Sequence, residues 1–180
     1  MGQNIYGVDI GTSNFKMCCK DKDKIINEKN IIAIANKKDI LAFGDEAYEM
    51  YEKAPEHIEV SFPVKFGVIA DIENMQTLLL RFFNKMNDDK KFTGNTDFYI
   101  AVPTDVTEVE KRAFYELVAD SKVKAKNIYI VDKPVADAIG AGLDVTKSKG
   151  IMIVNIGAET TEISVLSLGG IVISKSVKIG

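Results

Sequence analysis

The stretch Val8-Asp9-Ile10-Gly11-Thr12-Ser13-Asn14 contains the pattern from which the fold of this chain is predicted. Its first half ends a short apolar strand, and its second half is a turn of small polar residues, Gly11-Thr12-Ser13-Asn14. A turn that contains glycine can aim backbone N–H groups at one point and so bind an anion such as phosphate. Asp9 precedes the turn and is a carboxylate of the kind that holds hydrated magnesium. Taken alone, the turn is more often an ordinary hairpin loop.

A second stretch, Val154-Asn155-Ile156-Gly157-Ala158-Glu159-Thr160, repeats this order of strand, glycine turn and hydroxyl residue near the other end of the sequence. Apolar strands are predicted on both sides of its turn, at 151–156 and 162–167. Two such turns that face each other can clamp the phosphates of a nucleotide. Neither contains a Walker A pattern, and no GxGxxG motif follows a strand.

The segments between the two turns mix strands and helices. Helices are predicted over Asp45 to Lys53 with Asp45 as the cap, over Asp71 to Met86, from the capping box of Thr107 and Glu110 to about Ser121, and from Pro134 to Leu143. Strands are predicted over 5–10, 15–19, 31–35, 98–102, 128–131 and 171–177. The first three strands are expected to form a meander, with a charged turn at 20–24.

Composition and charge narrow the class of protein. The 180 residues include 23 Lys and Arg against 26 Asp and Glu, and the net charge of −3 provides no basic field for nucleic acid. No apolar run reaches the roughly 18 residues that a membrane-spanning helix needs, and the first residues lack the features of a signal peptide. A single histidine and no CxxC leave no recognisable zinc motif. These features predict a cytoplasmic protein with reduced thiols.

Taken in order, the motifs resemble those of the actin superfamily and, within it, the MreB family of bacterial cell-shape proteins. The first turn resembles the first phosphate loop, Lys133 to Gly142 resembles the first connecting helix, and Val154 to Glu162 resembles the second phosphate loop. Further matches follow in order and spacing: Gly67-Val68-Ile69-Ala70-Asp71, Ala101-Val102-Pro103, Val109-Glu110-Lys111-Arg112-Ala113, Ala138-Ile139-Gly140-Ala141-Gly142-Leu143 and Ser176-Val177-Lys178-Ile179-Gly180. The resemblance covers essentially the whole chain.

The resemblance implies an α/β fold of the actin-like, ribonuclease H-like type. Such a fold has a mixed sheet flanked by helices, a small inserted subdomain and a second lobe that is only begun in this sequence. Residues 1–33 and 66–145 would form subdomain IA, residues 34–65 subdomain IB, and residues 146–180 the opening strands of subdomain IIA. The rest of a usual family chain carries most of the adenine and ribose contacts and one filament face.

The resemblance also implies ATP and magnesium between the lobes. It implies head-to-tail filaments, built with itself or with an intact MreB-like relative, that lie on the inner face of the membrane and guide the wall-synthesis machinery. Asp9 would hold magnesium through water. The implied cofactor-binding residues are Asp9, Gly11, Thr12, Ser13, Asn14, Asn155, Gly157, Ala158, Glu159 and Thr160.

Four positions depart from the family pattern where the chemistry takes place. Lys133 replaces the glutamate that positions the attacking water, and a protonated lysine has no lone pair with which to act as a base. Asn155 replaces an aspartate that helps to orient the hydrated magnesium. Ala158 and Glu159 replace part of a glycine-rich turn, where alanine would be strained at a positive φ and glutamate would repel phosphate. These departures predict impaired ATP hydrolysis, and an ion pair between Lys133 and Glu159 is a further hypothesis.

Three functions stay open at this point. The preferred interpretation is an MreB-like cytoskeletal protein with impaired hydrolysis, and an active ATPase of the same fold is disfavoured by the departures above. The third is a truncated, nucleotide-independent interaction module that caps or regulates filaments of an intact relative. The hydrophobic loop through which relatives in the family touch lipid would map to Lys90-Lys91-Phe92, where an ordinary solvated loop is the preferred interpretation and a membrane contact the alternative.

Overall fold

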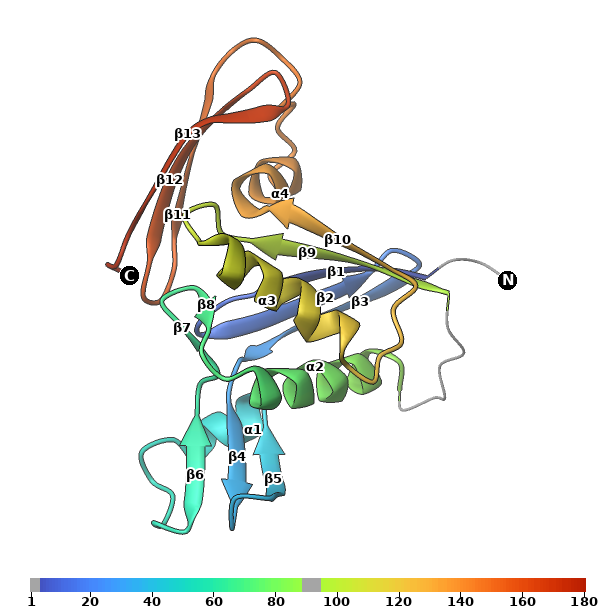
Figure 1. Cartoon of the computed structure of the whole chain (residues 1–180), viewed down its shortest axis with the longest axis vertical. Coiled ribbons are helices and arrows are strands. Elements are labelled where there is room, and N and C mark those ends of the chain that lie inside the picture. The colour runs from blue at the N-terminus through green and yellow to red at the C-terminus, as the bar shows by residue number, and fades with distance from the viewer. Residues whose placement is uncertain (1–3, 89–94) are drawn as a thin grey trace.

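A computed structural model describes residues 4–88 and 95–180 of the protein (Figure 1). Its largest sheet has five strands in the order β10-β9-β1-β2-β3. These strands are β1 (Asn4–Ile10), β2 (Asn14–Cys19), β3 (Lys22–Lys29), β9 (Thr96–Val102) and β10 (Asn127–Asp132). The pairs β1–β2 and β2–β3 are antiparallel, whereas β1–β9 and β9–β10 are parallel, so the sheet is mixed.

Two helices, α2 (Ile72–Met86) and α3 (Glu108–Ala119), lie against one face of this sheet (Figure 1). The carboxylate of Asp71 caps α2 by accepting a hydrogen bond from the N–H of Asn74 at 2.9 Å. The apolar stripe of α2 is buried in the main core, where Phe82 stacks on Phe15 of β2 with 4.5 Å between ring centroids. Burial of these side chains is the largest favourable contribution to folding.

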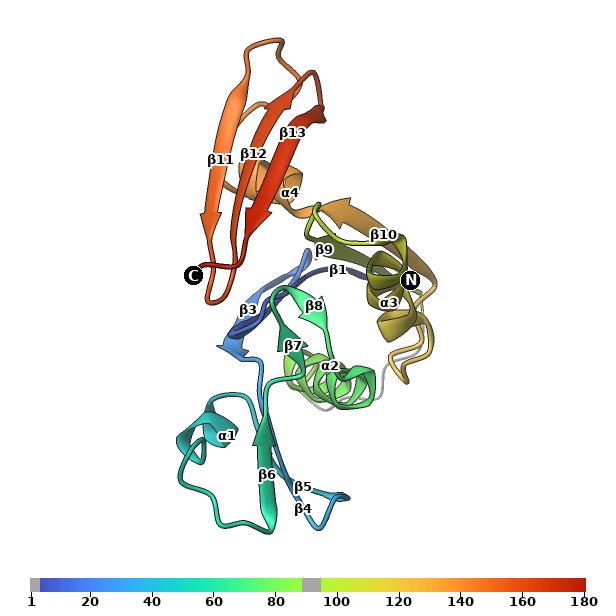
Figure 2. The same cartoon turned by 60° about the vertical axis from the view of Figure 1, so that its left-hand side comes forward.

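A smaller unit projects from the far side of α2 (Figures 1 and 2). It consists of a three-stranded sheet in the order β5-β4-β6 and a short helix. Its elements are β4 (Ile32–Ala35), β5 (Asp39–Phe43), α1 (Asp45–Glu49) and β6 (Ile58–Ser61). A small hairpin of β7 (Val64–Lys65) and β8 (Val68–Ile69) then leads back to α2.

The last part of the chain forms a separate antiparallel sheet at the opposite end of the molecule from the small unit (Figure 2). Its strands, in the order β11-β12-β13, are β11 (Ile151–Ile156), β12 (Thr161–Ser167) and β13 (Gly170–Val177). Helix α4 (Lys133–Gly140) lies between β10 and this sheet, and its Ala138 is buried with Leu166 of β12. Helix α4 thus connects the two large sheets.

Three sequence predictions about elements are wrong. The turn expected at 20–24 is confined to residues 20 and 21, and β3 begins at Lys22. The predicted third strand of the meander is β4, which instead pairs within the small unit. The helix predicted from Asp45 to Lys53 ends at Glu49, and Asp45 does not cap it, because its carboxylate accepts the backbone N–H of Lys29 at 2.9 Å.

The helix predictions at Asp71 and at Thr107 are confirmed, as are the strand predictions on either side of both glycine turns. In β2, Cys18 is exposed and Cys19 is buried, as expected for adjacent strand residues. Across residues 4–88 and 95–180, we find no helix with the length and apolar character that crossing a bilayer requires. The segment Lys90-Lys91-Phe92, to which the family's membrane loop would map, lies outside these residues.

Candidate functional site

Each of the two glycine turns is closed by an equivalent hydrogen bond, from the glycine N–H to the carbonyl of the residue three positions later. The N–H of Gly11 donates to the carbonyl of Asn14 at 3.0 Å, and the N–H of Gly157 donates to the carbonyl of Thr160 at 2.8 Å. A Cβ atom built on either glycine would lie 2.9 Å from that carbonyl oxygen. Each turn therefore requires glycine because the backbone approaches itself so closely. Ala158, in contrast, does not have a positive φ, so the strain expected at this residue is absent.

The two turns face each other across a cavity of about 70 Å³ between the five-stranded sheet and the β11–β13 sheet. The cavity brings together six predicted cofactor residues, Gly11, Thr12, Asn155, Gly157, Ala158 and Thr160. Lys133 is the one cationic side chain among the described residues that line it. The carboxylates of Asp105 and Glu162 line it as well, so the cavity carries both signs of charge.

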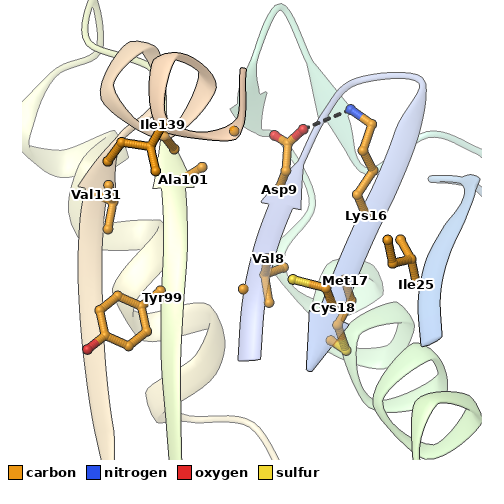
Figure 3. Close-up of a pocket in the computed structure, with 13 residues that line it drawn as sticks. Val8, Asp9, Lys16, Met17, Cys18, Ile25, Tyr99, Ala101, Val131 and Ile139 are labelled. Atoms are coloured by element: carbon orange, nitrogen blue, oxygen red, sulfur yellow. Dashed lines mark hydrogen bonds and ion pairs between the residues drawn. The ribbon is translucent and has the colours of Figure 1, made fainter. Parts of the chain in front are cut away.

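Four predicted cofactor residues do not line this cavity. Ser13 and Glu159 line a neighbouring cavity of about 440 Å³. Asn14 is the first residue of β2, and its Nδ2 donates to Oδ1 of Asn27 at 3.1 Å. Asp9 lies behind the first turn, at the edge of a third, apolar cavity of about 510 Å³ on the sheet face opposite α2 and α3 (Figure 3).

The tip of the β7–β8 hairpin bridges the two turns, a contact that sequence reasoning missed. The N–H of Phe66 donates to Oε2 of Glu159 at 2.6 Å, and the N–H of Gly67 donates to the hydroxyl of Thr12 at 3.2 Å. The hypothesis of an ion pair between Lys133 and Glu159 is therefore wrong, because Glu159 accepts from the hairpin and Lys133 pairs elsewhere. The sequence signal for the hairpin tip was Gly67, which has a φ of 78°.

Asp9 is held between two lysines. Its Oδ2 lies 2.9 Å from Nζ of Lys16, which is directly opposite on β2, and Figure 3 shows these two side chains pointing toward each other. Its Oδ1 lies 2.6 Å from Nζ of Lys133, the first residue of α4. Burial opposes the ionisation of Asp9, but the two lysines outweigh burial and hold the pKa of this carboxyl below its ordinary value.

Asn155 also has a partner that sequence reasoning missed. Its Nδ2 donates to Oδ2 of Asp137, four residues after Lys133 on α4, at 2.7 Å. Burial raises the pKa of Asp137, and the negative charges of Asp9 and Glu162 raise it further. The hydrogen bond from Asn155 and the charge of Lys133 lower the pKa, but they do not outweigh these causes. A carboxylate within a helix of small and apolar residues was the available signal for Asp137.

Glu162 links the β11–β13 sheet to the five-stranded sheet. Its buried carboxylate accepts the backbone N–H of Thr104, just beyond β9, at 3.0 Å and contacts the Thr104 hydroxyl. Oγ of Ser174 lies 2.6 Å from Oγ1 of Thr104 and 2.7 Å from Oγ of Ser164. The sequence signal for this network was Glu162 itself, a charged residue in the same alternating register of β12 as Ser164 and Leu166, which face inward.

The donors around Asp9 do not fit a magnesium ion. Magnesium prefers carboxylate oxygens and water, yet both oxygens of Asp9 are engaged by ammonium groups. Asn155 is neutral where the family pattern has an aspartate, so it supplies no negative charge for a cation. Among the residues that the structure describes, no three His, Cys, Asp or Glu side chains are grouped so that they could hold a metal ion.

Comparisons with known proteins identify the family. The family model described as MreB/Mbl protein matches residues 3–180. The cell shape-determining protein Mbl of Bacillus subtilis is 39% identical over 173 residues, which are 96% of this chain and 51% of that protein. The cell shape-determining protein MreB of Escherichia coli is 34% identical over an alignment of 185 positions, which covers 100% of this chain and 53% of that protein.

A solved structure shares the fold. The crystal structure of MreB 5 of Spiroplasma citri bound to AMPPNP matches with a TM-score of 0.88 and 31% identity, over 99% of this chain and 53% of that chain. The chain thus spans about half the length of the relatives that it matches. The actin-like fold predicted from the sequence is confirmed, and the chain belongs to the MreB/Mbl family of cell-shape proteins.

Proposed function

We propose that this chain forms the phosphate-binding side of a nucleotide cleft in an MreB-like cytoskeletal protein and that it binds nucleotide without hydrolysing it. The observation that carries the proposal is the pair of glycine turns that face one cavity, which Lys133 also lines. Each turn is closed by an equivalent hydrogen bond. Backbone N–H groups of such turns bind anions, and a lysine ammonium binds phosphate as a point charge. The Spiroplasma citri relative, bound to AMPPNP, supports a nucleoside triphosphate as the ligand.

The loss of hydrolysis follows from the partners of the charged groups. The ammonium of Lys133 donates to Asp9 and has no lone pair with which to accept a proton from water. Glu162, the buried carboxylate at the cavity, is held by Thr104. Asp137 is held by the amide of Asn155. None of these groups is free to act as the general base that positions and activates water.

In the cell, the proposed role is that of a filament protein. The chain would associate with itself or with an intact MreB-like relative in the cytoplasm, along the inner face of the membrane, where the family guides wall synthesis. Residues 1–33 with 66–145, residues 34–65 and residues 146–180 would then be parts of subdomains IA, IB and IIA. Their contribution is the phosphate side of the cleft, between the first and third of these parts.

The alternative, a nucleotide-independent module that caps filaments of an intact relative, is favoured by one observation. The β11–β13 sheet exposes apolar side chains on one face, where Met152, Val154 and Ile156 alternate along β11 and Val154 lies opposite Ile163 of β12. A contiguous apolar surface of this kind marks a protein contact. Such a contact does not require that the cavity between the turns hold any ligand.

Titration calorimetry with ATP and with inorganic tripolyphosphate tests the proposal, together with an assay of phosphate release from ATP. We expect both ligands to bind and no phosphate release above that of buffer. Thr160→Ala removes a hydroxyl that lines the cavity and should weaken binding by about tenfold, the loss of one hydrogen bond to a charged group. Thr77→Ala, which replaces a partly exposed threonine of α2, is the matched control and should bind as the wild type does.

Phosphate release above background would overturn the loss of hydrolysis. If neither ligand binds at millimolar concentration, the phosphate-binding function fails. Sedimentation with a full-length MreB-like protein then decides on the capping module: the chain should pellet with the filaments or reduce their amount. A chain that stays in the supernatant and leaves the filaments unchanged would exclude that alternative too.

A further inference from the structure

We infer that the Lys133 ammonium takes the place of a divalent cation in this cleft, so that the site binds phosphate groups without magnesium. The inference rests on the proposed phosphate-binding function and adds to it the metal requirement of the site. It starts from the disagreement between the magnesium that the family pattern implies and the donors that surround Asp9. The ligand class is an inorganic polyphosphate or the polyphosphate part of a nucleotide.

The position of the positive charge is fixed by the five-stranded sheet. Strands β1 and β10 flank β9, with Asp9 beside Ala101 and Asp132 beside Val102 of that strand. Lys133 directly follows Asp132, and its Nζ reaches Oδ1 of Asp9 at 2.6 Å. The Lys133 side chain is only 17% exposed. The ammonium is therefore held at the carboxylate that would otherwise hold the hydrated metal.

The ammonium has donors to spare for a ligand. A lysine ammonium carries three N–H donors, of which the structure commits one to Asp9. Lys133 also lines the cavity between the two glycine turns, whereas Lys16 pairs with the other oxygen of Asp9 and does not line it. The remaining donors of Lys133 are thus available on the side of Asp9 where the turns face each other.

The two lysines leave neither oxygen of Asp9 unpaired for a metal ion. One carboxylate is shared by two ammonium groups, so a divalent cation would meet two positive charges and no unpaired oxygen of Asp9. Asn155 supplies no charge, and its amide nitrogen is bound to Asp137. Magnesium that binds here would have to displace Lys133 from a partly buried ion pair.

Tripolyphosphate titrated into the chain in EDTA and, separately, in magnesium chloride tests this inference. We expect the wild type to bind in EDTA at least as tightly as in magnesium. Lys133→Gln should weaken binding in EDTA by tenfold or more. The matched control is Lys24→Gln, which removes a lysine of another Lys–Asp ion pair, with 2.6 Å between Lys24 Nζ and Asp88 Oδ1, remote from the cavity. Circular dichroism verifies that both variants are folded.

Binding that becomes tenfold weaker in EDTA would overturn the inference and leave the phosphate-binding function intact. If tripolyphosphate binds in neither condition, the phosphate-binding function fails, and the metal question is decided with Mn²⁺ alone by electron paramagnetic resonance. Saturable Mn²⁺ binding to the wild type overturns the inference. Exclusion of Mn²⁺ by the wild type supports it only if Lys133→Glu binds the ion, and a Lys133→Glu variant that also excludes Mn²⁺ overturns it.

Discussion

At the scale of residues, the cleft is a set of matched pairs. Lys133 finds a carboxylate in Asp9, and Asn155 finds one in Asp137. A buried or partly buried charge without a partner would cost several kcal/mol, roughly, so substitutions at such a site persist when their partners complement them. The two pairs indicate that the polar groups of the cleft complement a lysine at position 133.

Asp137 provides a prediction for the pH dependence of stability. Burial raises its pKa in the folded chain, so keeping it ionised at pH 7 disfavours the folded state. Asp137→Asn keeps an oxygen that can accept from Asn155 and removes the charge. We expect the free energy of unfolding at pH 7 to rise by less than about 1 kcal/mol, because solvent screens this partly exposed group. Urea unfolding measures it.

The sign of the pH dependence distinguishes the effect of the Asp137 charge from a general effect of replacing an aspartate by asparagine. As the pH falls through the raised pKa of Asp137, the wild-type side chain takes up a proton. The difference in the free energy of unfolding between Asp137→Asn and the wild type should then decrease to zero. Asp144→Asn is the control of opposite sign, since hydrogen bonds from Thr146 lower the pKa of the exposed Asp144. A lower stability of Asp137→Asn at pH 7 would contradict the prediction.

The residues of the site were partly predictable from the sequence. The two glycine turns are local patterns, so their glycines and hydroxyls could be named in advance. The partner of Lys133 was not predictable, because it depends on the register that brings Asp9 of β1 near the start of α4, 124 residues further along the chain. Glu159 likewise accepts from the hairpin tip at Phe66, which no local pattern connects to it.

At the scale of elements, the helices are specified by their ends as much as by their apolar stripes. The end of α2 is an example: Oδ1 of Asn87 accepts from the hydroxyl of Tyr6 at 2.7 Å, and its Nδ2 donates to the carbonyl of Phe83 at 2.7 Å. Burial raises the pKa of Tyr6 to about 12. These bonds attach the helix end to the first strand of the sheet.

The start of α3 provides a prediction for the stability of an element. Oγ1 of Thr107 accepts the N–H of Glu110 at 3.2 Å, and Oε2 of Glu110 accepts the N–H of Thr107 at 2.7 Å. Thr107→Ala should lower the free energy of unfolding by about 1 kcal/mol, because it leaves a helix N–H without its cap. Urea unfolding beside Thr77→Ala, where we expect a change within about 0.5 kcal/mol, measures the effect. Equal losses in the two variants would argue against the cap.

Two of the mispredicted elements, β3 and β4, were mispredicted for different physical reasons. Strand β3, with the sequence Lys-Asp-Lys-Ile-Ile-Asn-Glu-Lys, is an edge strand, and edge strands carry charges that oppose further pairing. These charges resemble those of a turn. Strand β4 was located correctly, but the sheet to which it belongs depends on β5 and β6, and a local apolar run does not specify its partners.

At the scale of the whole molecule, the cleft depends on how two sheets are held together. The glycine turns belong to different sheets, and they face each other only if the β11–β13 sheet keeps its position. Helix α4 connects the sheets along the chain (Figure 2), and Glu162 joins them through the backbone and hydroxyl of Thr104. The network of buried Glu162 with the partly buried Thr104 and Ser174 is therefore expected to set the width of the cleft.

Glu162→Ala tests this role by amide hydrogen exchange. The substitution removes the acceptor of the Thr104 N–H and of the partly buried hydroxyls of Thr104 and Ser174, which should cost about 1–3 kcal/mol because these hydrogen bonds go to a charged group. We expect faster exchange at Thr104 and along β12 and β13, whereas the amides of α2, buried in the main core, should exchange as in the wild type. Glu162→Gln keeps an oxygen acceptor and should show a smaller change if Glu162→Ala proves too unstable to measure.

The matched control is Glu59→Ala on β6, an exposed glutamate in a strand of the small unit. It should leave exchange at Thr104 unchanged. If Glu162→Ala exchanges at Thr104 as slowly as this control does, the network does not hold the sheets together, and their position is set by other contacts such as α4 and the β7–β8 hairpin. If α2 accelerates together with β12, the two sheets unfold as one unit, and the cleft cannot open without loss of the main core.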